Sequence, residues 1–238
     1  GRRRQGGTFR VRPECDYVIQ IIDLFHIDEM ETGKKIAKTL LQIKAIKLSP
    51  ANPFTWASGW RSPIYCDNRK TLSYPEARRE IYRAFAALVA AKYPQAEVIA
   101  GVATGAIACG VLTAEELGKP FIYVRSAPKD HGMANQVEGH FEPGAKVVVI
   151  EDLISTGGSS LKAVEALRAA GCEVLGMAAI FTYGFQTAVE NFERAGVQLD
   201  TLSNYNTLIE LAVEQNYIQP DQLETLRHWR KAPDTWGR

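Results

Sequence analysis

Two adjacent carboxylates, Glu151 and Asp152, stand at the end of a predicted buried strand whose last four residues, 147–150, are all apolar. A loop of small hydroxyl residues and glycines, 155–160, follows them. The next stretch, 161–170, has helical spacing of its apolar residues, and Gly171 is placed to end that helix. In open α/β sheets, ligands bind at the carboxyl ends of strands, so we expect the acids and the loop to share one binding site.

The residue types in this segment predict which ligand it binds. Glycines let the backbone N–H groups at the start of a helix approach a phosphate, and hydroxyls add further donors. The two acids would repel a phosphate, but they suit the vicinal hydroxyls of a ribose, which are neutral donors. The strand, the acid pair and the loop therefore indicate a ribose-5-phosphate site, the alternative being an ordinary strand–turn–helix with surface acids.

A second group of polar residues follows a predicted strand at 120–124. Arg125, Lys129 and His131 open a polar segment, 125–144, that has no apolar periodicity. Long loops without a core of their own are often lids, and three cations on a closing lid would neutralise a pyrophosphate as its bond breaks. Without the neighbouring ribose motif, the same cations would indicate only a solvated surface loop.

Strands and helices alternate along most of the chain, which predicts an α/β fold with a doubly wound, mainly parallel sheet flanked by helices. A short, aromatic-rich β segment around 54–66 predicts a small additional N-terminal lobe. The expected strands are 97–103, 120–124, 146–150, 173–181 and 199–202, and the expected helices are 75–92, 105–117, 161–170, 189–195 and, broken at Pro220, the part after 206.

Composition excludes several classes of protein. A net charge of +1 argues against a nucleic-acid or membrane-surface partner, and no apolar stretch approaches membrane-spanning length. Four scattered cysteines without a Cys-x-x-Cys motif argue against a disulfide framework or a structural zinc site, and fit a reducing cytoplasm. The Arg- and Gly-rich start predicts that residues 1–29 are a non-core extension and that 30–238 form a single domain that begins near Met30.

Three segments carry a more specific resemblance: residues 54–69, 123–132 and 151–159. In order and spacing they resemble the orotate phosphoribosyltransferases, members of the type I phosphoribosyltransferase family, and the resemblance covers the chain from about residue 30 onwards. It implies a hood over the acceptor at about 30–70, a core at about 71–205 and C-terminal helices at about 206–238. It also implies Mg²⁺ held mainly by substrate oxygens, and a cytoplasmic homodimer with shared active sites.

The resemblance assigns roles to residues by position. The reaction that it implies is transfer of ribose 5-phosphate from 5-phosphoribosyl 1-pyrophosphate (PRPP) to orotate. Ser155 would also touch orotate, and no residue is expected to be a dedicated metal ligand. The expected catalytic residues are Arg125, Lys129, His131 and Asp152. The expected PRPP-binding residues are Arg125, Lys129, His131, Glu151, Asp152, Leu153, Ile154, Ser155, Thr156, Gly157, Gly158 and Ser159.

Three positions depart from the family's better-studied bacterial branch: Ala57 and Gly105 stand where it has lysines, and Tyr183 stands where it has an orotate-binding arginine. The way in which the orotate carboxylate is held is therefore open. The candidate cations, each of which has plain surface charge as its alternative, are Arg61, Arg69 and Lys70. Two other functions stay open: a purine or uracil phosphoribosyltransferase, and a non-catalytic PRPP-sensing regulator.

Overall fold

The structure is a computed structural model that describes residues 29–127 and 136–237. The expected N-terminal extension lies outside the described residues except for Glu29, which begins the first helix, and so do Lys129 and His131. In the part of the chain that the structure describes, no helix combines the length and apolar character needed to cross a membrane.

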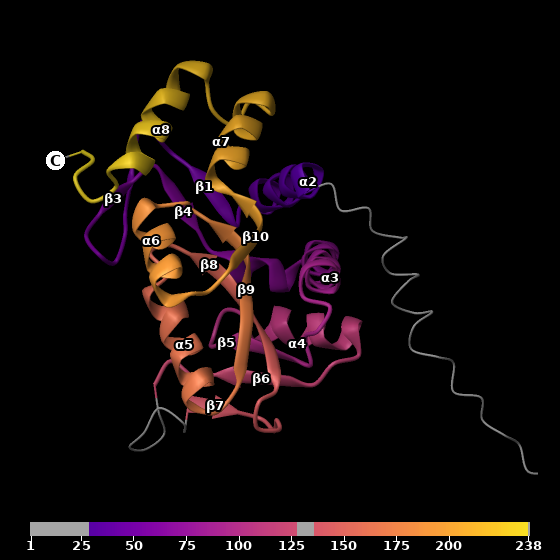
Figure 1. Cartoon of the computed structure of the whole chain (residues 1–238). Helices are drawn as coiled ribbons and strands as arrows, with labels where there is room; N and C mark the ends of the chain where they lie inside the picture. Colours follow the sequence, from indigo (N-terminus) through magenta and orange to yellow (C-terminus); the bar gives the residue numbers. More distant parts are fainter. Residues whose placement is uncertain (1–28, 128–135, 238) are drawn as a thin grey trace, which may run out of the picture.

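A six-stranded sheet forms the centre of the molecule, with the strand order β10-β9-β8-β5-β6-β7 (Figure 1). Neighbouring strands are parallel except for the short edge strand β7, which runs antiparallel to β6. The prediction of a mainly parallel sheet is thus confirmed. The strands are β5 (Val98–Val102), β6 (Phe121–Val124), β7 (Val137–Glu138), β8 (Lys146–Ile154), β9 (Glu173–Thr182) and β10 (Leu199–Asn204).

Helices cover both faces of this sheet. In Figure 1, α3 and α4 lie on one face and α5 and α6 on the other, so all five residues of the central strand β5 are buried. This double cover explains why the strands contain uninterrupted apolar runs. The helices are α2 (Glu29–Gln42), α3 (Pro75–Lys92), α4 (Ile107–Leu117), α5 (Gly158–Ala169), α6 (Gln186–Ala195), α7 (Tyr205–Glu214) and α8 (Leu223–Lys231), with 3₁₀ turns η1 (Asn68–Ser73) and η3 (Pro220–Gln222).

The N-terminal lobe contains two small antiparallel sheets. Strand β1 (Ile46–Leu48) pairs with β4 (Ile64–Cys66), and β2 (Phe54–Thr55) pairs with β3 (Arg61–Ser62). An aromatic cluster joins this lobe to the sheet and to α8: the Trp56 ring lies 5.2 Å from Tyr183 and 5.6 Å from Trp229, between ring centroids. The Trp229 indole N–H also donates to the Arg61 carbonyl at 3.2 Å.

One expected boundary is wrong in a way that matters for the site. The motif strand was expected to end before Glu151, but β8 continues to Ile154. The reason is tertiary: the long neighbouring strand β9 supplies partners, pairing Glu151 with Ala179 and Ile154 with Thr182. The two acids therefore sit inside a hydrogen-bonded strand, which holds their backbone in place.

Candidate functional site

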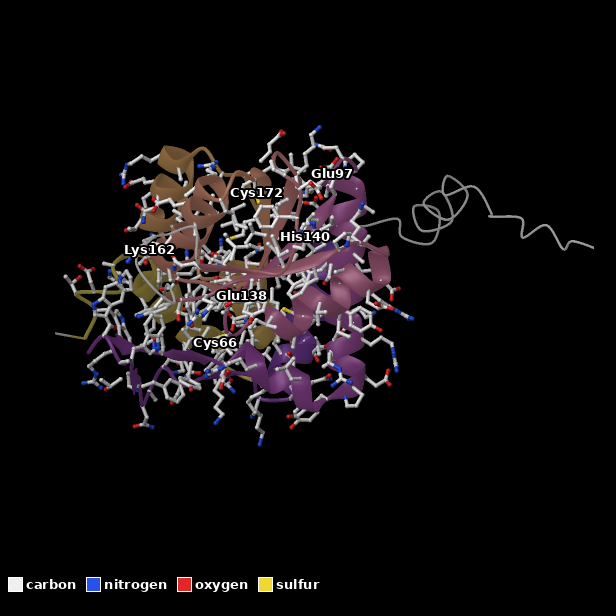
Figure 2. All side chains as sticks on the ribbon, turned by 90° about the horizontal axis from the view of Figure 1, so that it is seen from below. Cys66, Glu97, Glu138, His140, Lys162 and Cys172 are labelled. Carbon is white, nitrogen blue, oxygen red and sulfur yellow. The ribbon has the colours of Figure 1, made fainter. Side chains whose placement is uncertain are left out.

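A cavity of about 870 Å³ opens at the carboxyl ends of β5, β6 and β8. Its lining comes from distant parts of the sequence, for example Cys66 in the N-terminal lobe and Lys162 on α5, both labelled in Figure 2. The full set is Cys66, Asp67, Asn68, Arg69, Val102, Ala103, Thr104, Gly105, Arg125, Ser126, Gln136, Glu151, Asp152, Leu153, Ser159, Lys162, Ala163 and Glu165.

The two acids of the motif differ in environment. Glu151 is 5% exposed; one of its oxygens accepts from the Asp152 N–H at 2.9 Å and the other from the Ser160 hydroxyl at 2.8 Å. Burial, and then the negative charge of Asp152, raise the pKa of Glu151 to about 8. Asp152 is half-buried and lines the cavity. Glu151 therefore holds its proton more tightly than an ordinary glutamate does.

Residues from two other walls of the cavity fix the position of Asp152, one by a hydrogen bond and one by close packing. The Asn68 side-chain amide donates to the Asp152 carbonyl at 2.6 Å. A Cβ added at Gly105, in the loop between β5 and α4, would collide with the Asp152 carboxylate. A side chain at position 105 would therefore force the Asp152 carboxylate to move. The same loop contains a cis peptide bond between Ala103 and Thr104.

Ser155, Thr156 and Gly157 connect β8 to α5 and form the loop that was expected to bind phosphate. Gly157 has a φ of +81°, and a Cβ there would lie 2.6 Å from the Phe192 ring, so backbone and packing both require glycine. Asn191 holds the loop by donating to the Thr156 carbonyl at 2.9 Å. No described side chain caps α5, so its first N–H groups are left for an anion.

The structure divides the expected loop, residues 151–159, into four residues that line the cavity and five that do not, which are Ile154, Ser155, Thr156, Gly157 and Gly158. Glu151, Asp152, Leu153 and Ser159 line the cavity. Ile154 has a relative exposure of 0%, and its carbonyl accepts from the Tyr183 N–H at 3.2 Å, so its side chain belongs to the core. The roles assigned to the loop residues stay predictions.

Arg125 follows β6 directly and lines the same cavity. Its main chain is held twice by Gln136: Arg125 N–H donates to the Gln136 carbonyl at 2.8 Å, and the Gln136 amide donates to the Arg125 carbonyl at 3.1 Å. One guanidinium nitrogen, Nη1, is buried without a hydrogen-bond partner in the described residues, and the Glu138 carboxylate lies 3.7 Å from it. A buried donor without a partner at a cavity indicates a missing acceptor such as a ligand oxygen.

Sequence reasoning missed one part of this cavity as a binding element, the loop 103–105 after β5. This loop has the same strand, small-residue turn and helix pattern as the motif after β8 and could have been found by it. The segment 66–69 was expected in the hood, with Arg69 as a candidate cation, but its place beside Asp152 depends on a contact between distant residues.

The structure distinguishes the three cations that were candidates for binding the orotate carboxylate. Arg69 lines the cavity, whereas Arg61 and Lys70 do not, and Lys70 Nζ donates instead to the Lys44 carbonyl at 3.1 Å. Tyr183 is 3% exposed and stacked on Phe185 at 5.3 Å between ring centroids. Burial raises its pKa well above the usual value, so Tyr183 stays uncharged.

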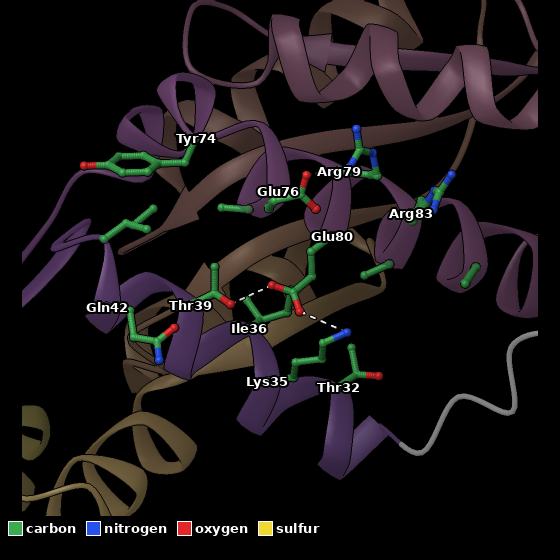
Figure 3. Close-up of a pocket in the computed structure, with 14 residues that line it drawn as sticks. Thr32, Lys35, Ile36, Thr39, Gln42, Tyr74, Glu76, Arg79, Glu80 and Arg83 are labelled. Carbon is green, nitrogen blue, oxygen red and sulfur yellow. Dashed lines mark hydrogen bonds and ion pairs between the residues drawn. The ribbon is translucent and has the colours of Figure 1, made fainter.

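A second cavity of about 750 Å³ lies between α2 and α3 (Figure 3). Glu80 binds both Thr39, whose hydroxyl donates to it at 2.6 Å, and Lys35, whose ammonium lies at 3.1 Å. This α2/α3 groove contains none of the predicted site residues.

The sheet, the acid pair, the glycine loop and the arginine at the cavity define a protein of the phosphoribosyltransferase class, and residues 73–211 match the phosphoribosyl transferase domain family. The chain is 61% identical over 205 residues to an orotate phosphoribosyltransferase of Porphyromonas gingivalis, covering 86% of this chain and 98% of that protein. It is 57% identical over 209 residues to one of Cytophaga hutchinsonii, covering 88% of this chain and 100% of that protein. A crystal structure of an Aeropyrum pernix orotate phosphoribosyltransferase matches with a TM-score of 0.66 and 31% identity, covering 74% of this chain and 96% of that one. The chain belongs to the orotate phosphoribosyltransferase family.

Proposed function

We propose that the protein transfers the ribose 5-phosphate group from PRPP to N1 of orotate, giving orotidine 5′-phosphate and pyrophosphate in pyrimidine biosynthesis. The observation that carries the proposal is the buried Nη1 of Arg125, which has no hydrogen-bond partner in the described residues, at the same cavity as the Asp152 carboxylate. One group suits an anionic leaving group and the other suits ribose hydroxyls, and family membership supports the acceptor.

In the proposed complex, each part of PRPP meets a different wall of the cavity. The 5-phosphate accepts from the N–H groups and hydroxyls at the start of α5, and the ribose hydroxyls donate to Asp152, with Glu151 behind it. The pyrophosphate accepts from Arg125, and from Lys129 and His131 of the segment that lies outside the described residues. The order of these groups along PRPP matches the order of the walls from α5 to the end of β6.

During transfer, the bond from ribose C1 to the pyrophosphate oxygen breaks, a bond from C1 to orotate N1 forms, and the N1 proton of orotate passes to the released pyrophosphate or to water. Positive charge develops on the ribose ring, and negative charge gathers on the leaving group. The Asp152 carboxylate stabilises the first and the cations stabilise the second, so both act more strongly in the transition state than in the ground state. No covalent bond to the enzyme is required.

Magnesium is part of this proposal, held mainly by substrate oxygens. The described residues contain no group of three or more His, Cys, Asp or Glu side chains that could hold a metal ion. The proposed donors are the oxygens of PRPP together with the Asp152 carboxylate. They fit Mg²⁺, which keeps several waters and prefers substrate phosphates with one or two carboxylates. When bound, the ion would add positive charge beside the pyrophosphate.

One assay tests the reaction. The protein is incubated with PRPP, Mg²⁺ and one nucleobase at a time, and pyrophosphate release is followed. We expect release with orotate and little with uracil, adenine, guanine or hypoxanthine. Release with one of the other bases instead would indicate a uracil or purine phosphoribosyltransferase. Binding of PRPP without release with any base would indicate a sensor.

We also propose that the enzyme is a cytoplasmic homodimer, in which Lys129 acts in the partner subunit's site. Free cysteines at 66, 109 and 172 support a reducing compartment.

To test the shared site, Lys129→Ala and Asp152→Asn proteins are mixed after each is shown to be at least about tenfold less active. If Lys129 acts in trans, half of the dimers are hybrids with one intact site, and activity recovers to roughly a quarter of wild type. If subunits exchange but activity does not recover, the lid acts in its own subunit.

A further inference from the structure

One wall of the cavity is not assigned to PRPP in the proposed complex, and it can therefore contact the acceptor base. The end of β8 with the start of α5, the loop after β5 and the residues after β6 surround the phosphoribosyl and pyrophosphate groups in the proposed complex. The remaining wall is the segment 66–69 of the N-terminal lobe. Because the base must reach C1 of a ribose held at Asp152, this wall is the one that it can contact.

The position of this wall relative to the ribose site is fixed by hydrogen bonds. Asn68 is 2% exposed and its amide donates to the Asp152 carbonyl at 2.6 Å. The Asp67 N–H donates to the Ala45 carbonyl at 2.8 Å, which joins the segment to the lobe behind it. Arg69 therefore stands one residue from a direct contact with the ribose-binding strand, and its side chain is 62% exposed.

Most N–H groups of the Arg69 guanidinium make no hydrogen bond among the described residues. Its Nε–H donates to an Asp67 carboxylate oxygen at 2.7 Å, and that oxygen also accepts the Arg69 backbone N–H at 3.2 Å. This contact orients the side chain and uses one of the five guanidinium N–H groups. The two terminal nitrogens have no hydrogen bond among the described residues, and they can bind a carboxylate end-on through two parallel bonds.

The other cations of the cavity belong to different walls. Among the described residues that line it, these are Arg125, beside the pyrophosphate, and Lys162, on α5 beside the phosphate loop. Tyr183, at the position that the resemblance to the family matched to an orotate-binding arginine, is uncharged and packed among aromatic rings. Orotate differs from uracil by a carboxylate, and an ionised carboxylate that enters a binding site without a partner is strongly disfavoured.

We propose that the Arg69 guanidinium binds the orotate carboxylate and makes the enzyme select orotate over uracil. This inference rests on the proposed reaction, and it moves the recognition of the carboxylate from the end of β9, where Tyr183 lies, to the N-terminal lobe. Asp67 acts as a positioning residue that orients Arg69.

The test compares Arg69→Gln with two matched variants, Arg61→Gln and Lys70→Gln, which remove cations of the same lobe that do not line the cavity. Michaelis constants are measured for orotate and for PRPP, with uracil as the acceptor that lacks the carboxylate. We expect Arg69→Gln to raise the orotate KM by about ten- to a hundredfold. The PRPP KM and the activity with uracil should stay within about twofold of wild type, and both control variants should match wild type.

An unchanged orotate KM in Arg69→Gln would overturn the inference, and so would an equal rise in both Michaelis constants, which indicates a structural effect. If Arg69→Gln does not fold, as judged by thermal unfolding, Arg69→Lys decides: the charge remains but the two-bond geometry is lost, so the orotate KM alone should rise. A wild-type enzyme that releases no pyrophosphate with orotate would contradict the proposed function itself, which separates that failure from the failure of this inference.

Discussion

Two cavities among the described residues have similar volumes, about 870 Å³ at the ends of the strands and about 750 Å³ in the α2/α3 groove, but their charged side chains differ in how fully they are hydrogen-bonded. In the groove, acids and bases are paired: Glu80 binds Lys35 and Thr39, and Arg79 binds Glu76 at 2.8 Å. At the strand ends, Arg125 Nη1 is buried without a hydrogen-bond partner in the described residues.

The difference shows what distinguishes a binding site from a gap between helices. A helix surface can satisfy its own charges with neighbours one turn away or on the facing helix, and such a groove gains little from a ligand. The carboxyl ends of parallel strands bring together loops whose polar groups have no regular partner, so these groups remain available to a ligand. The predictions below test whether charge satisfaction, rather than volume, separates the two regions.

The largest expected effect comes from removing Arg125, whose Nη1 has no hydrogen-bond partner in the described residues. Arg125→Gln should lower turnover by about a hundredfold, about 2.7 kcal/mol, because one charged donor to the leaving group is lost. Its matched control, Lys35→Gln, removes a paired cation of the groove and should leave turnover within about twofold of wild type. Steady-state kinetics of both purified variants measure this, and equal losses in the two would remove the distinction between the cavities.

A smaller effect should follow from crowding Asp152. The Cβ in Gly105→Ala would meet the Asp152 carboxylate, so the carboxylate must move, and kcat/KM should fall by about tenfold. Gly33→Ala is the control, because a Cβ there would lie 3.6 Å from the Leu202 carbonyl oxygen, an ordinary contact. Wild-type kinetics in Gly105→Ala would mean that the position of Asp152 does not matter for the reaction.

Glu151 makes stability depend on pH. Its pKa rises from 4.5 in the unfolded chain to about 8 in the folded protein, so the folded state binds the proton more tightly. Its contribution to stability is full below the lower pKa and is lost as the pH rises through the higher one. Between about pH 6 and about pH 9, the free energy of unfolding should therefore fall by roughly 2–3 kcal/mol more in wild type than in Glu151→Gln.

Denaturant unfolding at both pH values measures that difference. Glu76→Gln, which replaces an acid whose side chain is 88% exposed, should keep the wild-type pH dependence. Parallel pH curves for wild type and Glu151→Gln would show that the buried carboxyl is already ionised at neutral pH.

The smallest expected effect belongs to the groove. Glu80→Gln removes the charge that pairs with Lys35 but keeps an acceptor for Thr39, so the free energy of unfolding should drop by about 0.5–1 kcal/mol. Turnover should not change. A loss of activity in this variant, with the fold intact, would assign the groove a part in the reaction.

Local sequence determined much of the scaffold. The helix predicted at 75–92 has those bounds, because Pro75 suits a first helical position and the apolar spacing continues to Val89. The predicted helix after the phosphate loop ends where expected, since Gly171 adopts a φ of +93°. The ribose-phosphate motif was recognisable for the same reason: its strand, acids, loop and helix are contiguous, so their chemistry can be read from neighbouring residues.

Only the tertiary structure decided how those parts meet. Pairing with β9 extends β8 through the acid pair, and burial raises the pKa of Glu151. Arg61, Arg69 and Lys70 look alike in the sequence, yet Arg69 alone of the three lines the cavity. The physical reason is common to these cases: exposure, pairing and the pKa of a side chain depend on residues far away in the chain, and only the folded protein brings those residues together.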